Sequence, residues 1–180
     1  MNIFIAGGHG VGKTFLTGRL QLPSGMFATS ASKLIKEERG QANWNVDKRV
    51  AEVDENQVAL ASAVRRHNDA GTRLLLDGHF VLLDAEGALI PLSAEVFATL
   101  NLSGVILLQA HADVVAQRIL ERDGREADLS EITAVAAAEQ AQANQVCCEL
   151  GLTMVTMPSP RLEEFAAFVE LFAGARARAD

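Results

Sequence analysis

Residues 7–14 read Gly7-Gly8-His9-Gly10-Val11-Gly12-Lys13-Thr14 and match the pattern G-x-x-x-x-G-K-[ST] at every fixed position. They follow a short apolar run, 3–6, and precede a segment with a helical pattern, 14–21. Glycines allow such a loop to wrap around phosphate with its backbone N–H groups pointing inward, and the start of the helix adds a partial positive charge. We therefore predict that residues 7–14 bind the phosphates of ATP or of a close relative.

The residue types inside this loop predict separate roles. The Lys13 ammonium is expected to reach the β- and γ-phosphates, and the Thr14 hydroxyl is expected to bind Mg²⁺. His9 and Val11 occupy variable positions of the pattern. The His9 side chain is expected at the surface of the loop, with contact to a phosphate as the alternative. ATP and Mg²⁺ are therefore the predicted cofactors.

Length and composition restrict the class of protein. The chain has 180 residues, which favours a single domain, and its net charge of −7 argues against general binding to DNA or RNA. No signal peptide is expected, because the N-terminal apolar run has no basic residues before it and stops at glycines after a few residues. No membrane span is expected, because the Ala-rich stretch 134–143 carries Glu139 and other polar residues and reads as a soluble helix. Adjacent Cys147 and Cys148 are read as reduced thiols, so a cytoplasmic location is expected.

Short apolar runs alternate with longer helical patterns along the chain. The runs predicted as strands are 3–6, 26–29, 73–77, 104–108 and 152–155. The segments predicted as helices are 14–21, 30–38, 47–70, 93–100, 112–123, 129–150 and 161–173, with a small hairpin inside 80–90. This alternation predicts an α/β fold with a parallel sheet covered on both faces. Ligands bind at the carboxyl ends of the strands in such sheets, so the residues that follow each strand are candidate site residues.

The apolar run 73–77 ends in an aspartate. Asp77 stands where a carboxylate that organises Mg²⁺ is expected, and a simple turn residue is the alternative. Gly78 follows in place of the glutamate that activates water in many ATPases, which favours transfer to a bound acceptor over hydrolysis. His79 comes next and is read either as a structural residue or as part of the substrate site.

Three arginines follow the run 104–108. Arg118, Arg122 and Arg125 are spaced by four and three residues, which predicts one helix face just before a turn at Gly124. Behind a phosphate loop this face suits a lid whose guanidinium groups stabilise the charge on a transferring phosphoryl group. The alternative is a solvated face that pairs with neighbouring acidic residues.

The phosphate loop, the strand that ends in Asp77-Gly78-His79 and the arginines together resemble the adenylate kinase group of P-loop nucleoside monophosphate kinases. The short chain and its Asp-x-His pattern are most similar to the small archaeal-type and nuclear adenylate kinases. The resemblance implies a doubly wound sheet of five parallel strands of the P-loop NTPase type. It also implies one domain over residues 1–180, with an acceptor-binding helical region about 30–70 and a lid about 118–130.

The same resemblance implies an acceptor site on the helical region. Ser32 and Lys33 would lie near its start, Arg39 would hold an acceptor phosphate, and Asn56 and Gln57 would meet a base or ribose. The chain departs from the family where a Thr-Gly pair is usual, because Ala31-Ser32 stands there, and Phe-Pro-Arg after Asp-Gly is absent.

Three functions remain open from the sequence. The first is a kinase that transfers the γ-phosphoryl group of ATP to a nucleoside monophosphate or a similar small acceptor. The second is a small-molecule kinase with a sugar, an acid or a cofactor precursor as its acceptor. The third is a nucleotide-dependent ATPase or switch that acts on a protein partner.

Overall fold

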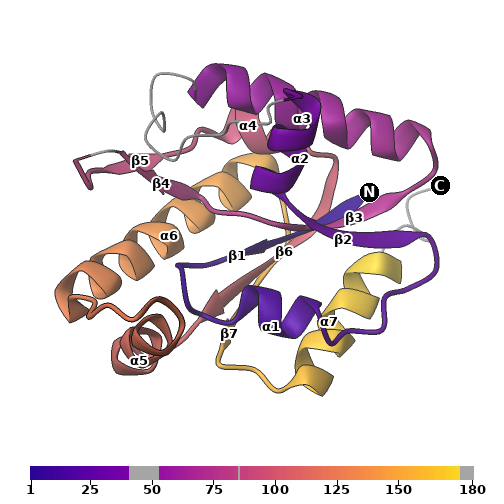
Figure 1. Cartoon of the computed structure of the whole chain (residues 1–180). Coiled ribbons are helices and arrows are strands. Elements are labelled where there is room, and N and C mark those ends of the chain that lie inside the picture. Colours follow the sequence, from indigo (N-terminus) through magenta and orange to yellow (C-terminus); the bar gives the residue numbers. More distant parts are fainter. Residues whose placement is uncertain (41–52, 85, 175–180) are drawn as a thin grey trace.

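A computed structural model describes residues 1–40, 53–84 and 86–174 of the chain. Its centre is a five-stranded sheet in which all neighbouring strands are parallel, in the order β2-β3-β1-β6-β7 (Figure 1). The strands are β1 Asn2–Ala6, β2 Met26–Ser30, β3 Arg73–Asp77, β6 Leu102–Gln109 and β7 Met154–Pro158. The predicted doubly wound sheet of five parallel strands is therefore confirmed.

Helices cover both faces of this sheet (Figure 1). One face packs against α2 Ala31–Glu38, α3 Val53–Asp69, α4 Ala94–Ala98 and α6 Leu129–Leu150. The other face packs against α1 Lys13–Thr17, α5 Ala112–Asp123 and α7 Leu162–Gly174. Successive side chains of a strand point to opposite faces, so Phe4 enters the first core while Ile3 and Ile5 enter the second. No helix in the described part of the chain is both long and apolar enough to cross a membrane.

The hairpin expected inside 80–90 is present. β4 Val81–Leu83 pairs antiparallel with β5 Leu89–Pro91, and both strands lie against α6. The Asp84 carboxylate accepts a hydrogen bond of 2.7 Å from the Ala88 backbone N–H, which closes the turn. The hairpin follows shortly after β3. It therefore leads from the carboxyl edge of the sheet to α6.

Several element boundaries differ from the sequence prediction, and two of the differences have a clear physical reason. The helix expected over 14–21 ends at Thr17, because the chain turns at Gly18 and brings Leu20 and Leu22 against the core on that face. The last strand begins at Met154 and not at 152, because the Leu152 N–H still bonds to the Cys147 carbonyl as part of the α6 cap. Residues 47–52 of the expected long helix and most of the expected loose tail 174–180 lie outside the described residues.

Candidate active site

The phosphate loop joins β1 to α1 at the carboxyl edge of the central strand. Gly7 and Gly12 have φ values of 135° and 108°, which residues with a Cβ rarely adopt. A Cβ at Gly7 would also overlap the Leu108 carbonyl oxygen of β6, so the loop packs directly on the neighbouring strand. The glycines of the motif therefore serve both the curvature of the loop and its close packing.

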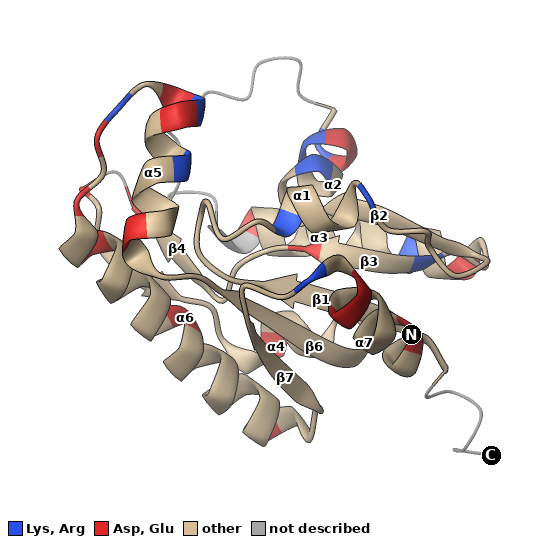
Figure 2. Ribbon diagram, turned by 90° about the horizontal axis from the view of Figure 1, so that it is seen from below, with Lys and Arg blue, Asp and Glu red and all other residues tan. Residues whose placement is uncertain are grey.

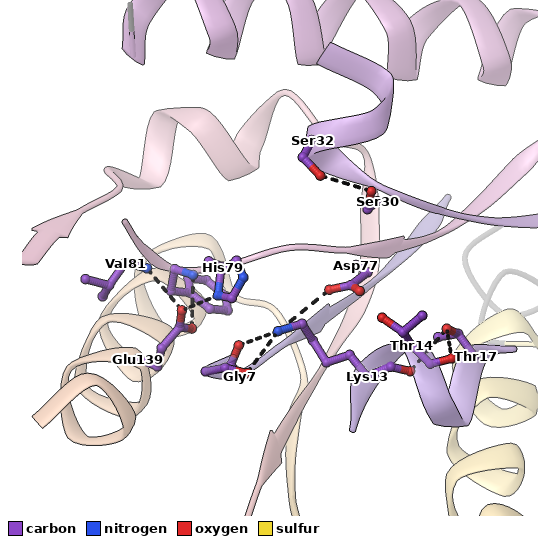
Figure 3. Close-up of polar contacts among 12 residues, drawn as sticks. Gly7, Lys13, Thr14, Thr17, Ser30, Ser32, Asp77, His79, Val81 and Glu139 are labelled. Carbon is purple, nitrogen blue, oxygen red and sulfur yellow. Dashed lines mark hydrogen bonds and ion pairs between the residues drawn. The ribbon is translucent and has the colours of Figure 1, made fainter. Parts of the chain in front are cut away.

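Lys13 lies inside the loop and points toward Asp77 (Figure 3). Its Nζ donates to the carbonyl oxygens of Gly7 at 2.5 Å and Gly8 at 3.2 Å, and lies 3.8 Å from Asp77 Oδ1. The Lys13 side chain is only 8% exposed. Burial lowers the pKa of Lys13, and the Asp77 carboxylate opposes that shift. Burial likewise raises the pKa of Asp77, against the attraction of Lys13 and His79.

Thr14 and Asp77 are the candidate Mg²⁺ ligands. Thr14 is exposed in the first turn of α1, and Asp77 ends β3 beside the Lys13 ammonium. A hydroxyl and a carboxylate are hard oxygen donors that fit Mg²⁺, which commonly binds through one or two protein ligands together with substrate phosphates. Within the described residues no group of three or more His, Cys, Asp or Glu side chains is placed to hold a metal.

Gly78 has a packing role that the sequence did not reveal. A Cβ at this position would lie 2.7 Å from two atoms of the Phe4 ring, and 3.7 Å from the Ala31 Cβ at the start of α2. The residue after Asp77 is therefore a glycine because the buried Phe4 ring occupies the space of a side chain. The same contact places the start of the expected acceptor region next to the segment Asp77–His79.

His9 and His79 lie together at the phosphate loop. The centroids of their rings are 4.7 Å apart. His9 is exposed on its outer side, as expected for the loop surface. The protein packed around its inner side lowers the pKa of His9 to about 4, with further lowering by His79, Lys13 and Arg122.

Glu139 is a residue of the candidate site that its sequence context did not reveal. The Ala-rich stretch 134–143 forms part of a helix, as expected, and within it the Glu139 side chain is only 1% exposed. Its carboxylate bonds to His79 Nδ1 at 3.1 Å and to the backbone N–H groups of Phe80 and Val81 at 3.0 and 3.4 Å (Figure 3). The sequence offered one indication that Glu139 is buried, which is its spacing on the helix. Glu139 stands four residues before Ala143 and seven before Val146, and both of these residues are buried.

The three arginines do not share one helix face in this structure. Arg118 donates from Nη1 to the carbonyl oxygens of Gly10 and Val11, and so contacts the phosphate loop. Arg122 pairs with the adjacent Asp123 through two hydrogen bonds of 2.7 Å, which raise the pKa of Arg122 and lower that of Asp123.

Arg125 was wrongly placed on the helix by its spacing. Gly124 adopts a left-handed conformation that ends α5 at Asp123, so Arg125 lies exposed in the connection to α6. Figure 2 shows Lys and Arg beside Asp and Glu at this end of α5. Arg118 therefore contacts the phosphate loop from α5, Arg122 lies in the last turn of α5, and Arg125 lies beyond the helix.

The expected acceptor region divides into two polar groups. At the start of α2, Ser32 Oγ lies 3.1 Å from Ser30 Oγ, and exposed Lys33 pairs with Glu37 at 3.9 Å. Ser30 also caps the helix by accepting a hydrogen bond from the Lys33 N–H.

The second group joins the end of α2 to α3. Arg39 donates to Asn56 Oδ1 at 2.6 Å and to Glu55 Oε2 at 3.1 Å, and its side chain is 14% exposed. The structure thus brings Arg39 and Asn56 together, and the roles that the resemblance implies for them stay predictions. Gln57 Oε1 and Thr29 Oγ1 are buried without a hydrogen-bond partner in the described ranges.

These features define a class of protein and a family. A parallel sheet in this order, with the G-x-x-x-x-G-K-[ST] loop after its central strand, is the α/β fold of P-loop nucleotide-binding proteins. A family model described as AAA domain matches residues 6–135, and the chain belongs to that family. No curated protein matches the sequence.

Solved kinases share the fold over nearly the whole chain. A gluconokinase from Sinorhizobium meliloti 1021 is 15% identical, with a TM-score of 0.53 over 97% of this chain and 91% of the other. A sugar kinase from Janibacter sp. HTCC2649 is 14% identical, with a TM-score of 0.57 over 96% and 93%. The P-loop kinase fold implied by the resemblance is confirmed. The narrower likeness to nucleoside monophosphate kinases stays a prediction.

Proposed function

We propose that the chain is an ATP-dependent phosphotransferase that moves the γ-phosphoryl group of ATP with Mg²⁺ to a small acceptor. The observation that carries this proposal is the position of Lys13, whose Nζ lies inside the phosphate loop and 3.8 Å from Asp77 Oδ1. A buried cation at this point stabilises the charge on the transferring phosphoryl group. Thr14 and Asp77 would hold the Mg²⁺, which supplies charge neutralisation at the β- and γ-phosphates when bound.

Transfer to an acceptor is favoured over hydrolysis by the environment of Gly78. The Phe4 ring leaves no room for a side chain after Asp77, so this position offers no carboxylate to activate a water molecule. The proposed reaction therefore needs a second substrate that brings its own nucleophilic oxygen.

The proposed arrangement is one domain with two working regions. The helical region about 30–70 would bind the acceptor, and the segment about 118–130 would act as a lid. Within the lid, Arg122 and Arg125 would approach the transferring group, while Arg118 already contacts the phosphate loop. The phosphates of ATP would lie on residues 7–14.

We favour a small hydroxyl-bearing acceptor, such as a sugar or a sugar acid, over a nucleoside monophosphate. Glu55 lies 3.1 Å from the Arg39 guanidinium, and a carboxylate in that position weakens the attraction of Arg39 for an acceptor phosphate. The fold is shared with a gluconokinase and a sugar kinase, which supports the same choice. The partly buried pair of Arg39 and Asn56 keeps a nucleoside monophosphate as the second candidate, because this pair would suit a phosphate or a base.

A product assay tests the proposal. ATP labelled on its γ-phosphate is incubated with Mg²⁺ and one acceptor from a panel of AMP, CMP, UMP, GMP, gluconate and simple sugars. Label in a phosphosugar supports the favoured acceptor, and label in a nucleoside diphosphate supports the second. The Lys13→Ala variant, checked for folding by circular dichroism, should lose transfer in either case. Label found only in free phosphate, at a rate independent of every acceptor, would support the nucleotide-dependent switch and contradict the kinase.

A further inference from the structure

Two side chains of α6 hold the β4–β5 hairpin at both of its ends. The Glu139 carboxyl oxygens accept hydrogen bonds from the Phe80 N–H at 3.0 Å and from the Val81 N–H at 3.4 Å, where the hairpin begins (Figure 3). Gln142 Nε2 donates to the Leu92 carbonyl oxygen at 2.7 Å, where the hairpin ends. Glu139 and Gln142 are three residues apart and therefore lie on one face of the helix. The hairpin is thus anchored to α6 at its entry and at its exit.

The two ends of the hairpin are also bonded to each other. The Leu92 N–H donates to the Phe80 carbonyl oxygen at 2.9 Å, so the chain enters and leaves the hairpin at one point. The Phe80 ring is fully buried and stacks on Phe97 with 4.4 Å between the ring centroids. This root of the hairpin, where residues 80 and 92 meet α6, is therefore part of the packed core.

The root lies at the edge of the sheet where ATP is proposed to bind. β3 ends at Asp77, whose carboxylate lies 3.8 Å from Lys13 Nζ in the phosphate loop. Two residues later the His79 ring lies against the His9 ring of the same loop, with 4.7 Å between centroids, and Phe80 follows. Figure 1 shows the hairpin projecting beyond the carboxyl end of β1. The hairpin therefore extends outward from the place proposed for the γ-phosphate.

The two strands of the hairpin offer an apolar surface at this place. Every residue of β4 and β5 is apolar, namely Val81, Leu82, Leu83, Leu89, Ile90 and Pro91. Leu89 is exposed, and Leu83 and Ile90 are partly exposed, so part of this surface is accessible. Apolar side chains cannot pair with a phosphate group, whereas they pack well against carbon atoms. The strands therefore suit the carbon skeleton of an acceptor and offer nothing to a second phosphate.

We propose, on the basis of the phosphotransferase function above, that the β4–β5 hairpin forms one wall of the acceptor site and that Glu139 and Gln142 are the positioning residues that hold it there. Neither side chain contacts the reacting atoms. Both act through the backbone of residues 80, 81 and 92, so their loss displaces the hairpin and the acceptor but leaves the phosphate loop in place. A displacement of about 1 Å is enough to lower a rate by about 10²-fold.

Hydrogen exchange tests the anchoring without an activity assay. Glutamine keeps the size of Glu139 but has one acceptor oxygen for two N–H donors, and Gln142→Ala removes the bond to Leu92. In either variant the amides of Phe80, Val81 and Leu92 should exchange at least about 10-fold faster than in the wild-type protein, while the amides of β3 stay protected. Unchanged exchange at these three amides would overturn the anchoring.

The controls for this experiment lie on the same helix. Gln145 and Glu149 are exposed on α6, so Gln145→Ala and Glu149→Gln repeat the two chemical changes away from the hairpin. Both control variants should exchange as the wild-type protein does. Equal acceleration of the β3 amides in Gln142→Ala and Glu139→Gln would show a general loss of stability, and that result also overturns the proposal.

Acceptor kinetics test the role of the hairpin as a wall of the site. Gln142→Ala is the cleaner variant, because Glu139 also lies 3.1 Å from His79 Nδ1. With the acceptor that the labelled-ATP assay identifies, kcat/KM for the acceptor should fall about 10-fold in Gln142→Ala and about 10²-fold in Glu139→Gln. The Kd for ATP, measured by calorimetric titration, should change less than about twofold, since the phosphate loop is not displaced.

The outcomes separate this proposal from the function on which it rests. Normal acceptor kinetics in a Gln142→Ala protein whose hairpin amides exchange faster would overturn the wall and leave the phosphotransferase intact. Parallel losses of ATP binding and of acceptor turnover would make both side chains merely structural, which also overturns the proposal. Absence of acceptor-dependent transfer in the wild-type protein overturns the function and the wall together, even where exchange shows the hairpin anchored. If Glu139→Gln fails to fold, Gln142→Ala still decides.

Discussion

Arg118 Nη1 lies 3.0 Å from the carbonyl oxygen of Gly10, and the same nitrogen donates to the Val11 carbonyl at 3.1 Å. The C=O and N–H groups of a trans peptide point in opposite directions. The N–H groups of Val11 and Gly12 therefore point away from Arg118. A guanidinium on α5 thus helps to orient two backbone donors of the phosphate loop.

Loss of Arg118 should weaken ATP binding more than it slows the chemical step. Without its two hydrogen bonds the loop would sample orientations that do not bind phosphate, so we expect Arg118→Ala to raise the Kd for ATP roughly 10-fold, about 1.4 kcal/mol. Calorimetric titration with ATP and Mg²⁺ measures this change. The neighbouring Gln117→Ala, which removes only a surface contact with Glu121, serves as the control. Unchanged ATP affinity with a large fall in kcat would instead assign Arg118 to the transition state.

Asp77→Asn should alter the Mg²⁺ dependence of the reaction. The variant keeps the shape of the side chain and loses the charge that would hold the metal, so kcat should fall about 10–100-fold and the Mg²⁺ concentration for half-maximal rate should rise. ATP affinity should change less. Rates measured across a Mg²⁺ series check this prediction. A variant that is only less stable, with an unchanged Mg²⁺ response, would make Asp77 a turn residue.

The pKa of His9 predicts a pH-dependent stability. This pKa is about 4 in the folded chain, below the ordinary value of 6.5, so the unfolded chain binds more protons between these values. The contribution of neutral His9 to the free energy of unfolding is fully present above pH 6.5 and is lost as the pH falls toward 4. The wild-type protein should therefore lose more stability than His9→Gln between pH 7.5 and 4.5. Thermal melts of both proteins at these two pH values measure the difference, and parallel losses would contradict the prediction.

Gly78→Ala should destabilise the fold. The added Cβ would lie 2.7 Å from the Phe4 ring, which packs edge-on against Phe80 and Phe97 and has little room to move. Overpacking of this kind costs about 1–3 kcal/mol. Urea unfolding measures the change, with Gly174→Ala as the control because nothing lies within 4 Å of a Cβ there. Equal stability of Gly78→Ala and wild type would show that Phe4 moves freely.

The fold and the phosphate loop were predictable because each depends on local signals. The spacing of the glycines and Lys13, and the alternation of apolar runs with helical patterns, fix the order of elements and the edge where ligands bind. Asp77 was found for the same reason, since it ends an apolar strand. The turn residues between Asp84 and Gly87 likewise indicated the hairpin within 80–90.

Contacts between distant segments were not predictable from those signals. Glu139 lies 60 residues from His79, and a lone carboxylate in an Ala-rich helix reads as a solvated residue until the helix is docked. The reason for Gly78 likewise depends on Phe4, which lies in another strand. The spacing of the three arginines also gave a wrong prediction for Arg125, because Gly124 ends α5 before this residue.

Arg122 is the residue that best tests the lid. Its guanidinium is bound to Asp123 through Nε and Nη2, and an exposed pair of this kind contributes little, so Arg122 can exchange Asp123 for a phosphate at small cost. If it then stabilises the transferring phosphoryl group, Arg122→Ala should lower kcat about 10²–10³-fold and raise the KM for ATP much less.

Two further variants make this prediction sharp. Arg122→Lys should recover little of the rate, because lysine keeps the charge and loses the planar fork that pairs with two oxygens. Asp123→Asn releases Arg122 from its partner and should keep the wild-type kcat or exceed it. Steady-state rates with the identified acceptor check all three proteins. Near-wild-type kcat in both Arg122→Ala and Arg122→Lys would remove the lid from the mechanism and favour a nucleotide-dependent switch over a kinase.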